Sequence, residues 1–170
     1  RPFDELAATC EHMVGVASDG AVVWDMETGL VVKTLKLRSG SLCRSAAWAH
    51  DQLCTSWDDR HVRIYSSATW KVLRLVGFQT TQPCRLRVHG RKLLALSGDP
   101  VMRRHEDSDI GEVKIVSIDI DTMELDHQLR FKDGVNFRCF TVTRSGRVWA
   151  TTQQSLLRIG SGGAGSQGGV

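Results

Sequence analysis

Three segments of this chain repeat one pattern, in which an alternating apolar stretch runs into a polar turn and then a threonine. The central residues of the three segments are Trp24, Tyr65 and Ile118, and the threonine follows four positions later in each. Trp24 and Tyr65 are 41 positions apart, whereas Tyr65 and Ile118 are 53 apart. A fixed period indicates a repeat architecture, in which stacked copies of one unit share a continuous core. The chain is therefore expected to consist of copies of one unit.

The longer second interval is explained by an insertion. A charged stretch with turn residues at both ends covers positions 99 to 111, and without it the interval returns to about the first value. A fourth copy of the pattern then falls at residues 156–159, with Ile159 placed 41 positions after Ile118. A period in the low forties is typical of four-stranded β-propeller blades.

Each unit also contains the strands that a blade requires. In the second unit, short runs at positions 45–48, 53–55, 62–65 and 71–75 are separated by polar turns. No stretch of comparable length has apolar residues at helical spacing, and β-branched residues dominate the alternating runs. The predicted fold class is all-β, with about four blades of four antiparallel strands.

The residues that carry this repeat resemble a known family. A Ser18-Asp19-Gly20 turn, an apolar strand and Trp24-Asp25 are similar to the third strand of a WD-repeat blade. Residues 59–65 repeat the arrangement with Tyr65 in the tryptophan position, and the resemblance extends to about residue 160. It implies a β-propeller whose closed ring has seven blades, and a protein-protein interaction scaffold or adaptor as its function.

The repeat divides the chain into a partial propeller and a tail. The expected blades cover residues 5–40, 41–82, 83–135 and 136–160, followed by a flexible Gly/Ser-rich tail at 161–170. Four blades in an open row would leave strand edges bare at both ends. We therefore expect a segment of a larger ring, completed by further sequence or by another chain, with a closed four-blade ring as the alternative.

Composition narrows the class of protein. The 170 residues are 41% hydrophobic and 24% charged, which is ordinary for a folded globular chain. The net charge of +3 is spread along the sequence, which argues against a nucleic-acid ligand, and no apolar run is long enough to span a membrane. The five cysteines are widely spaced, as expected of reduced thiols, so the predicted location is the cytoplasm or the nucleus.

Arginines recur where the inner strand of each blade should begin. Arg44 and Arg85 are 41 positions apart, and Arg138 follows 53 positions later. Long loops on rigid scaffolds often bind partners, and the insertion is expected on the same face. This face should hold an acidic or phosphorylated peptide through bidentate contacts. The alternative is that the arginines are solvated or pair with a neighbouring blade and that the insertion is a spacer. The predicted partner-binding residues are Arg44, Arg85, Arg138, Arg103, Arg104, His105, Glu106 and Asp107.

No constellation for catalysis, metal binding or a cofactor is predicted. The six histidines and five cysteines do not combine with a nucleophile, a base and an orienting group. The acidic residues at 107–112 are too few for calcium, and the glycines at 160, 162 and 165 open no helix that could hold a dinucleotide. Trp57 and Trp70 are expected at turns, where one of them could anchor a partner.

Three functions remain open. The favoured one is a scaffold that is not an enzyme and binds a protein segment on the propeller face. The alternative is a structural subunit that completes a propeller with another chain. An enzyme or small-ligand binder that uses the central channel is less favoured, because the expected innermost strands are largely apolar.

Overall fold

The computed structural model describes residues 3–17, 19–37, 40–78, 83–97, 113–131, 139–151 and 156–159, and for Cys84 and His127 it describes only the backbone. Every regular element in these ranges is a β-strand. In chain order the strands are β1 (Glu5–Ala8), β2 (His12–Ala17), β3 (Gly20–Asp25), β4 (Val31–Leu35), β5 (Cys43–Ala49), β6 (Gln52–Trp57), β7 (His61–Ser66), β8 (Val72–Gly77), β9 (Pro83–His89), β10 (Lys92–Ser97), β11 (Val113–Asp119), β12 (Leu125–Phe131), β13 (Cys139–Val142), β14 (Val148–Thr151) and β15 (Leu156–Ile159).

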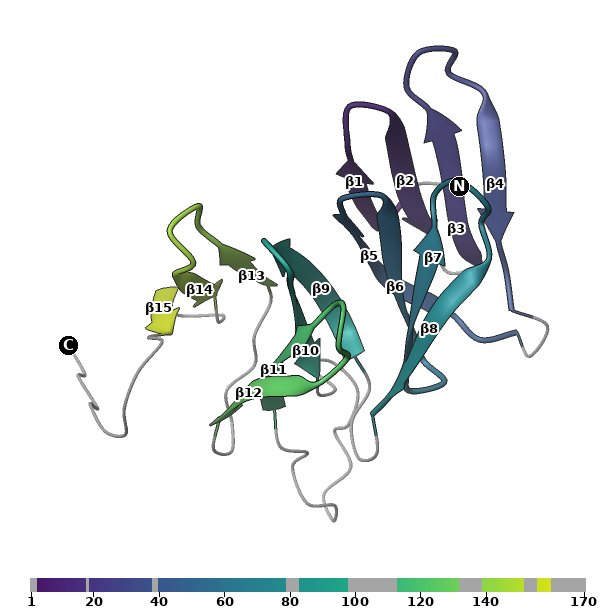
Figure 1. The fold of residues 1–170 in the computed structure, drawn as a ribbon. Coiled ribbons are helices and arrows are strands. Elements are labelled where there is room, and N and C mark those ends of the chain that lie inside the picture. Colours follow the sequence, from purple (N-terminus) through teal and green to yellow (C-terminus); the bar gives the residue numbers. More distant parts are fainter. Residues whose placement is uncertain are drawn as a thin grey trace.

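The strands form four antiparallel sheets, each a simple meander of consecutive strands. Strands β1–β4 form blade 1, β5–β8 blade 2, β9–β12 blade 3, and β13–β15 the described part of blade 4. Figure 1 shows the blades following one another from β1–β4 at the right to β13–β15 at the left. The predicted all-β fold of propeller blades is confirmed.

A separate apolar core fills the space between each pair of neighbouring blades. Blade 1 packs on blade 2 through residues such as Val14, Val23, Leu53 and Trp57. Blades 2 and 3 share a second core, and blades 3 and 4 share a third that contains Phe140. Each inner blade is therefore buried on both faces, whereas blades 1 and 4 each share a core on one face.

The threonine of the sequence repeat closes the turn between the third and fourth strands. The Thr28 amide donates to Asp25 Oδ1 at 2.7 Å, and the Thr122 amide donates to Asp119 Oδ1 at 3.0 Å. In blade 2 the Thr69 amide donates to Ser66 Oγ at 3.3 Å. These are the local side-chain turns that Asp and Ser favour. The backbone amide of the threonine is also the main reason why the pKa values of Asp25 and Asp119 lie below their usual range. The repeat seen in the sequence thus has a structural cause.

Side-chain hydrogen bonds connect the innermost strands of neighbouring blades. Ser45 Oγ on β5 accepts from the Leu86 amide on β9 at 3.0 Å. Glu5 Oε2 on β1 accepts from the Ala46 amide on β5 at 3.4 Å. An inner strand pairs with only one neighbour in its own sheet, so its other edge presents backbone groups that need partners. These side chains supply partners to the next blade along the chain.

Of the two tryptophans expected at turns, Trp70 lies at one and Trp57 does not, and neither is fully exposed. Trp57 is the last residue of β6 and is fully buried in the core between blades 1 and 2. Trp70 is in the turn before β8, but it is half-buried and packs edge-on against Trp48 and His12 at ring-centroid distances of 6.3 and 5.6 Å. The prediction was wrong for Trp57 because the strand β6 extends two residues further than its apolar pattern indicated. Among the described residues there is no helix that could span a membrane.

Candidate functional site

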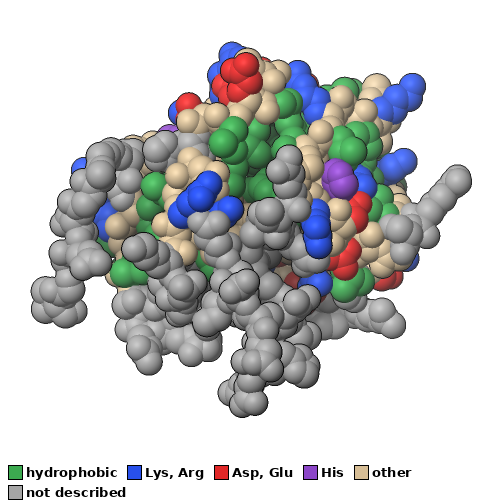
Figure 2. Space-filling view, turned by 90° about the horizontal axis from the view of Figure 1, so that it is seen from below, with side chains coloured by type: hydrophobic (Ala, Val, Ile, Leu, Met, Phe, Trp, Pro, Cys, Tyr) green, Lys and Arg blue, Asp and Glu red, His purple; other side chains and the backbone are tan. Residues whose placement is uncertain are grey.

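The candidate site lies on the side of the blades where the inner strands β5 and β9 begin, which we call the arginine face. The end of β10 at Ser97 and the start of β11 at Val113 also lie on this side, because β10 runs antiparallel to both β9 and β11. Figure 2 looks at the molecule from below Figure 1 and shows Lys and Arg side chains beside Asp and Glu side chains on this face. Its two described predicted residues are Arg44 and Arg85.

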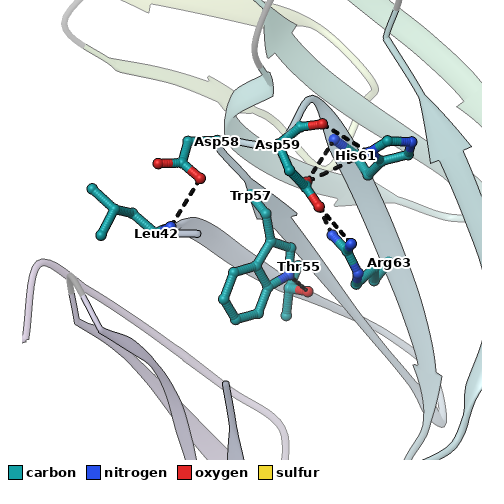
Figure 3. Close-up of polar contacts among 7 residues, drawn as sticks. All are labelled: Leu42, Thr55, Trp57, Asp58, Asp59, His61 and Arg63. Carbon is teal, nitrogen blue, oxygen red and sulfur yellow. Dashed lines mark hydrogen bonds and ion pairs between the residues drawn. The ribbon is translucent and has the colours of Figure 1, made fainter. Parts of the chain in front are cut away.

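Arg44 is weakly held by its own blade. Its Nη2 lies 3.9 Å from Asp58 Oδ2, and 45% of its side chain is exposed. The other oxygen of this carboxylate, Asp58 Oδ1, accepts from the Leu42 amide at 2.9 Å (Figure 3). That hydrogen bond holds one oxygen of the Asp58 carboxylate on the backbone at Leu42, so only the other oxygen is near Arg44. The Arg44 side chain is therefore partly exposed and has no short hydrogen bond to Asp58.

Arg85 is weakly held by a different blade. Its Nη1 lies 3.8 Å from Glu5 Oε2 of blade 1, and 35% of its side chain is exposed. Of the two described arginines, Arg85 thus contacts another blade, whereas Arg44 contacts its own. At these distances both pairs are ion pairs without a short hydrogen bond.

Glu5 is the centre of the polar contacts between blades. Its carboxylate is 9% exposed, and Oε1 accepts from Arg87 Nη1 of β9 at 2.7 Å. The same Arg87 nitrogen donates to the Leu86 carbonyl at 2.7 Å, and the guanidinium carbon lies 5.8 Å from the centre of the Phe140 ring. One carboxylate of blade 1 is therefore shared by two guanidinium groups of blade 3, which leaves this cluster with one excess positive charge.

The two exposed arginines do not occupy equivalent positions in their blades. In β5 the pairing with β6 passes from Cys43 to Ser45, so Arg44 is the unpaired residue of a β-bulge. In β9 the pairing with β10 passes from Pro83 to Arg85, so Arg85 follows the bulge and faces Leu96. The 41-residue spacing in the sequence suggested one repeated position. The bulges offset the two side chains by one residue along the strand, although both are on the arginine face.

A second arginine cluster near this face is tightly closed. Asp59 accepts two hydrogen bonds from Arg63, at 3.1 and 2.5 Å, and its Oδ1 also accepts from the His61 amide at 3.1 Å (Figure 3). Burial alone would raise the pKa of Asp59, but these donors outweigh it and lower that pKa. The Arg63 guanidinium also lies 5.8 Å from the centre of the Trp57 ring, whose Nε1 donates to Thr55 Oγ1 at 2.7 Å. Both terminal nitrogens of Arg63 are thus bonded to Asp59.

Six of the predicted site residues lie outside the described part of the chain. They are Arg138, Arg103, Arg104, His105, Glu106 and Asp107. The strands that flank the insertion, β10 and β11, end and begin at Ser97 and Val113. The described residues next to the insertion, Ser97 and Val113, therefore lie at the arginine face.

Sequence reasoning missed Glu5 and the contact of His12 with Trp48 and Trp70. The His12 and Trp48 rings are stacked 5.6 Å apart at the contact of blades 1 and 2, and Trp48 Nε1 donates to the Ala7 carbonyl at 3.3 Å. A weak signal for Glu5 was present, since it precedes Ala46 by 41 residues, which is the repeat period. Nothing local indicated its pairing with Arg87, which is 82 residues away.

The cysteines do not form a reactive or metal-binding centre in the described residues. The four whose side chains are described are free thiols, and burial is the main reason why the pKa values of Cys43 and Cys54 rise to about 12. These two thiols are therefore protonated at neutral pH and are poor nucleophiles. The described ranges also contain no group of three or more His, Cys, Asp or Glu that could hold a metal ion.

Comparison with known proteins shows the fold. No family model and no curated protein sequence matches the chain. A chain of the "Crystal Structure of Mitotic Checkpoint Complex" superposes with a TM-score of 0.70 at 14% identity, covering 87% of this chain and 43% of that one. The computationally designed Ika4 protein superposes with a TM-score of 0.67 at 18% identity, covering 94% of this chain and 92% of that one. This chain thus spans less than half of the first structure's chain and nearly all of the second. Together with the four stacked sheets, these similarities identify a β-propeller arrangement.

Proposed function

We propose that the chain is a WD-like protein-interaction scaffold whose arginine face binds an acidic segment of another protein through Arg44 and Arg85. One observation carries the proposal. The nearest carboxylates of these two arginines lie 3.9 and 3.8 Å away, whereas Arg63 and Arg87 are held at 2.5 and 2.7 Å. Arg63 and Arg87 are thus held by short hydrogen bonds within the fold. Arg44 and Arg85 have only longer contacts, which a ligand can replace with shorter ones.

The chemistry of arginine favours a carboxylate or phosphate ligand. A guanidinium presents its donors in a planar fork, and a carboxylate or phosphate can accept two of them in parallel. A ligand that approaches Arg44 and Arg85 replaces contacts of nearly 4 Å with short charge-assisted hydrogen bonds. Glu5 stays neutralised during this exchange, because Arg87 remains on its Oε1 atom. Binding an acidic segment therefore leaves no buried carboxylate without a partner.

Two further features support a protein ligand. The fold is shared with a chain of a mitotic checkpoint complex, so propeller blades of this kind occur in a multi-protein assembly. The strand ends that flank the insertion, Ser97 and Val113, lie on the side of the arginine face, and long insertions on rigid scaffolds often bind partners. The proposal includes no catalytic activity and no nucleic-acid or membrane ligand, and it places the protein in the cytoplasm or nucleus. These parts rest on composition and the cysteine pattern.

The test is a fluorescence-anisotropy titration with a labelled glutamate-rich peptide and the same peptide carrying phosphoserine. Each short charge-assisted hydrogen bond contributes about 1.5–3 kcal/mol, so Arg44→Gln with Arg85→Gln should weaken binding at least about tenfold. The control is Arg91→Gln with Lys92→Gln, which removes the same charge from the opposite face, where these residues pair with Asp121 and Asp126. Its affinity should stay within about twofold of wild type. Equal losses in both variants would show that binding follows net charge only, and would overturn the site.

A further inference from the structure

One position of the inner strand is buried in three blades and bare in the first. In each blade this position lies three residues before the hairpin that joins the first and second strands begins. The residues at this position are Leu6, Ala46, Leu86 and Phe140, and the hairpins begin at Thr9, Ala49, His89 and Thr143 respectively. Ala46, Leu86 and Phe140 pack on the preceding blade and are at most 1% exposed. Leu6 is 60% exposed. The face of blade 1 that should receive a preceding blade is thus uncovered.

A position of the third strand shows the converse in blade 4. In each blade, one residue of the third strand pairs with the same position of the second strand. These residues are Ala21, Val62, Ile115 and Leu156 in blades 1 to 4. The first three pack on the following blade and are at most 2% exposed, whereas Leu156 is 62% exposed. The face of blade 4 that should receive a following blade is uncovered too.

Each uncovered face carries a tryptophan, and on blade 4 Arg158 pairs with Trp149 on the same face. On blade 1, Phe3 and Trp24 contact edge to face at a ring-centroid distance of 5.1 Å and cover Gly15, where a Cβ atom would lie 2.8 Å from Phe3. On blade 4, Trp149 and Thr141 pair directly across β13 and β14, next to Leu156 on the same face. The residues at the same positions of blade 3, Leu94 and Arg87, lie at its contact with blade 4.

We propose that a second copy of this chain covers these faces, with blade 4 of each copy packed on blade 1 of the other. The uncovered faces are the two unlike halves of the contact that already occurs three times within the chain. One copy supplies the half that the other lacks, and two such contacts related by a twofold axis close the pair into a ring of eight blades, four from each copy. In such a closed ring, the uncovered faces of blade 1 and blade 4 are both buried.

The internal contacts show what this docking would bury. In the core between blades 3 and 4, Ile115 and Phe140 belong to one cluster, so the equivalent Leu156 and Leu6 should come together between copies. This proposal does not rest on the proposed function, because neither uncovered face includes Arg44 or Arg85.

Analytical ultracentrifugation of the purified chain from low to high micromolar concentration tests the contact. We expect a reversible dimer. Leu6→Arg and Leu156→Glu should each sediment as a folded monomer, since a charge on either face would be buried without a partner. An equimolar mixture of the two variants should form a dimer again, because one of its two contacts is wild type and the other contains both substitutions as an ion pair. The matched control, Leu73→Arg, changes a leucine of the outer strand β8 that is 50% exposed and should leave the dimer intact.

Three outcomes would overturn the proposal. The wild-type chain could remain a monomer throughout, the mixture could fail to dimerise, or Leu73→Arg could abolish the dimer as completely as Leu6→Arg does. Circular dichroism on each variant identifies a loss of folding, and in that case Leu6→Gln and Leu156→Gln replace the charged variants. Peptide binding at the arginine face is measured separately, so the failure of one proposal leaves the other standing.

Discussion

Trp57→Ala should lower the free energy of unfolding by about 3–5 kcal/mol, the range found when a large buried aromatic side chain is removed. Trp57 is fully buried between blades 1 and 2, and its Nε1 donates to Thr55 Oγ1. The substitution empties the largest side chain from that core and leaves the Thr55 hydroxyl without its donor. Arg63 also loses the ring beside its guanidinium.

Urea unfolding followed by far-UV circular dichroism measures this effect. Trp57→Phe keeps a ring in the core and should lower stability by about half as much or less, because most of the apolar contact remains. Leu73→Ala removes a half-exposed side chain and should stay within about 0.5 kcal/mol of wild type. A Trp57→Ala protein within 1 kcal/mol of wild type would contradict the assignment of Trp57 to the core and not to a turn.

Glu5→Ala should lower the free energy of unfolding by roughly 2–3 kcal/mol. Removing one partner of a buried ion pair typically has an effect of about 3–5 kcal/mol, but Arg85 and Arg87 are one-third exposed and regain water, which reduces it. The Ala46 amide also loses its acceptor. Glu5→Gln preserves an acceptor for that amide and should therefore be less destabilising.

A double-mutant cycle separates the ion pair from the packing. Glu5→Ala combined with Arg87→Ala should be less destabilising than the sum of the two single changes, because residues in contact are coupled. Glu5→Ala should also retain or increase the affinity for an acidic peptide, since it frees Arg85 from its only carboxylate contact within 4 Å among the described residues. Additive stability changes, or lost peptide binding in a folded Glu5→Ala protein, would contradict the role given to Glu5.

The sequence predicted the blades because their signals are local. Alternating apolar residues define the strands, and the threonine at a fixed offset reflects the turns closed by Asp25, Ser66 and Asp119. The position of each inner strand and the place of the insertion followed from the same period. These features depend on residues close together in the chain, so a single sequence reveals them.

The site was predicted only in part because its geometry depends on distant residues. The bulge at Arg44 shifts the side chain relative to Arg85, and a spacing of 41 residues does not reveal that shift. The distinction between the weakly held Arg85 and the tightly held Arg87 depends on Glu5 of blade 1, far away in the sequence. Trp57 was predicted at a turn because the polar residues after Thr55 hid the end of its strand.

The proposal that the arginine face binds an acidic segment is tested most directly by amide chemical-shift mapping of the ¹⁵N-labelled chain during titration with the glutamate-rich peptide. The largest shifts should fall on the amides of residues 42–45, 58 and 85–87, which surround Arg44 and Arg85. The hairpins on the opposite side, at residues 10–11, 50–51 and 90–91, should be unaffected. Largest shifts in those hairpins, or shifts spread evenly over both faces, would contradict the proposal.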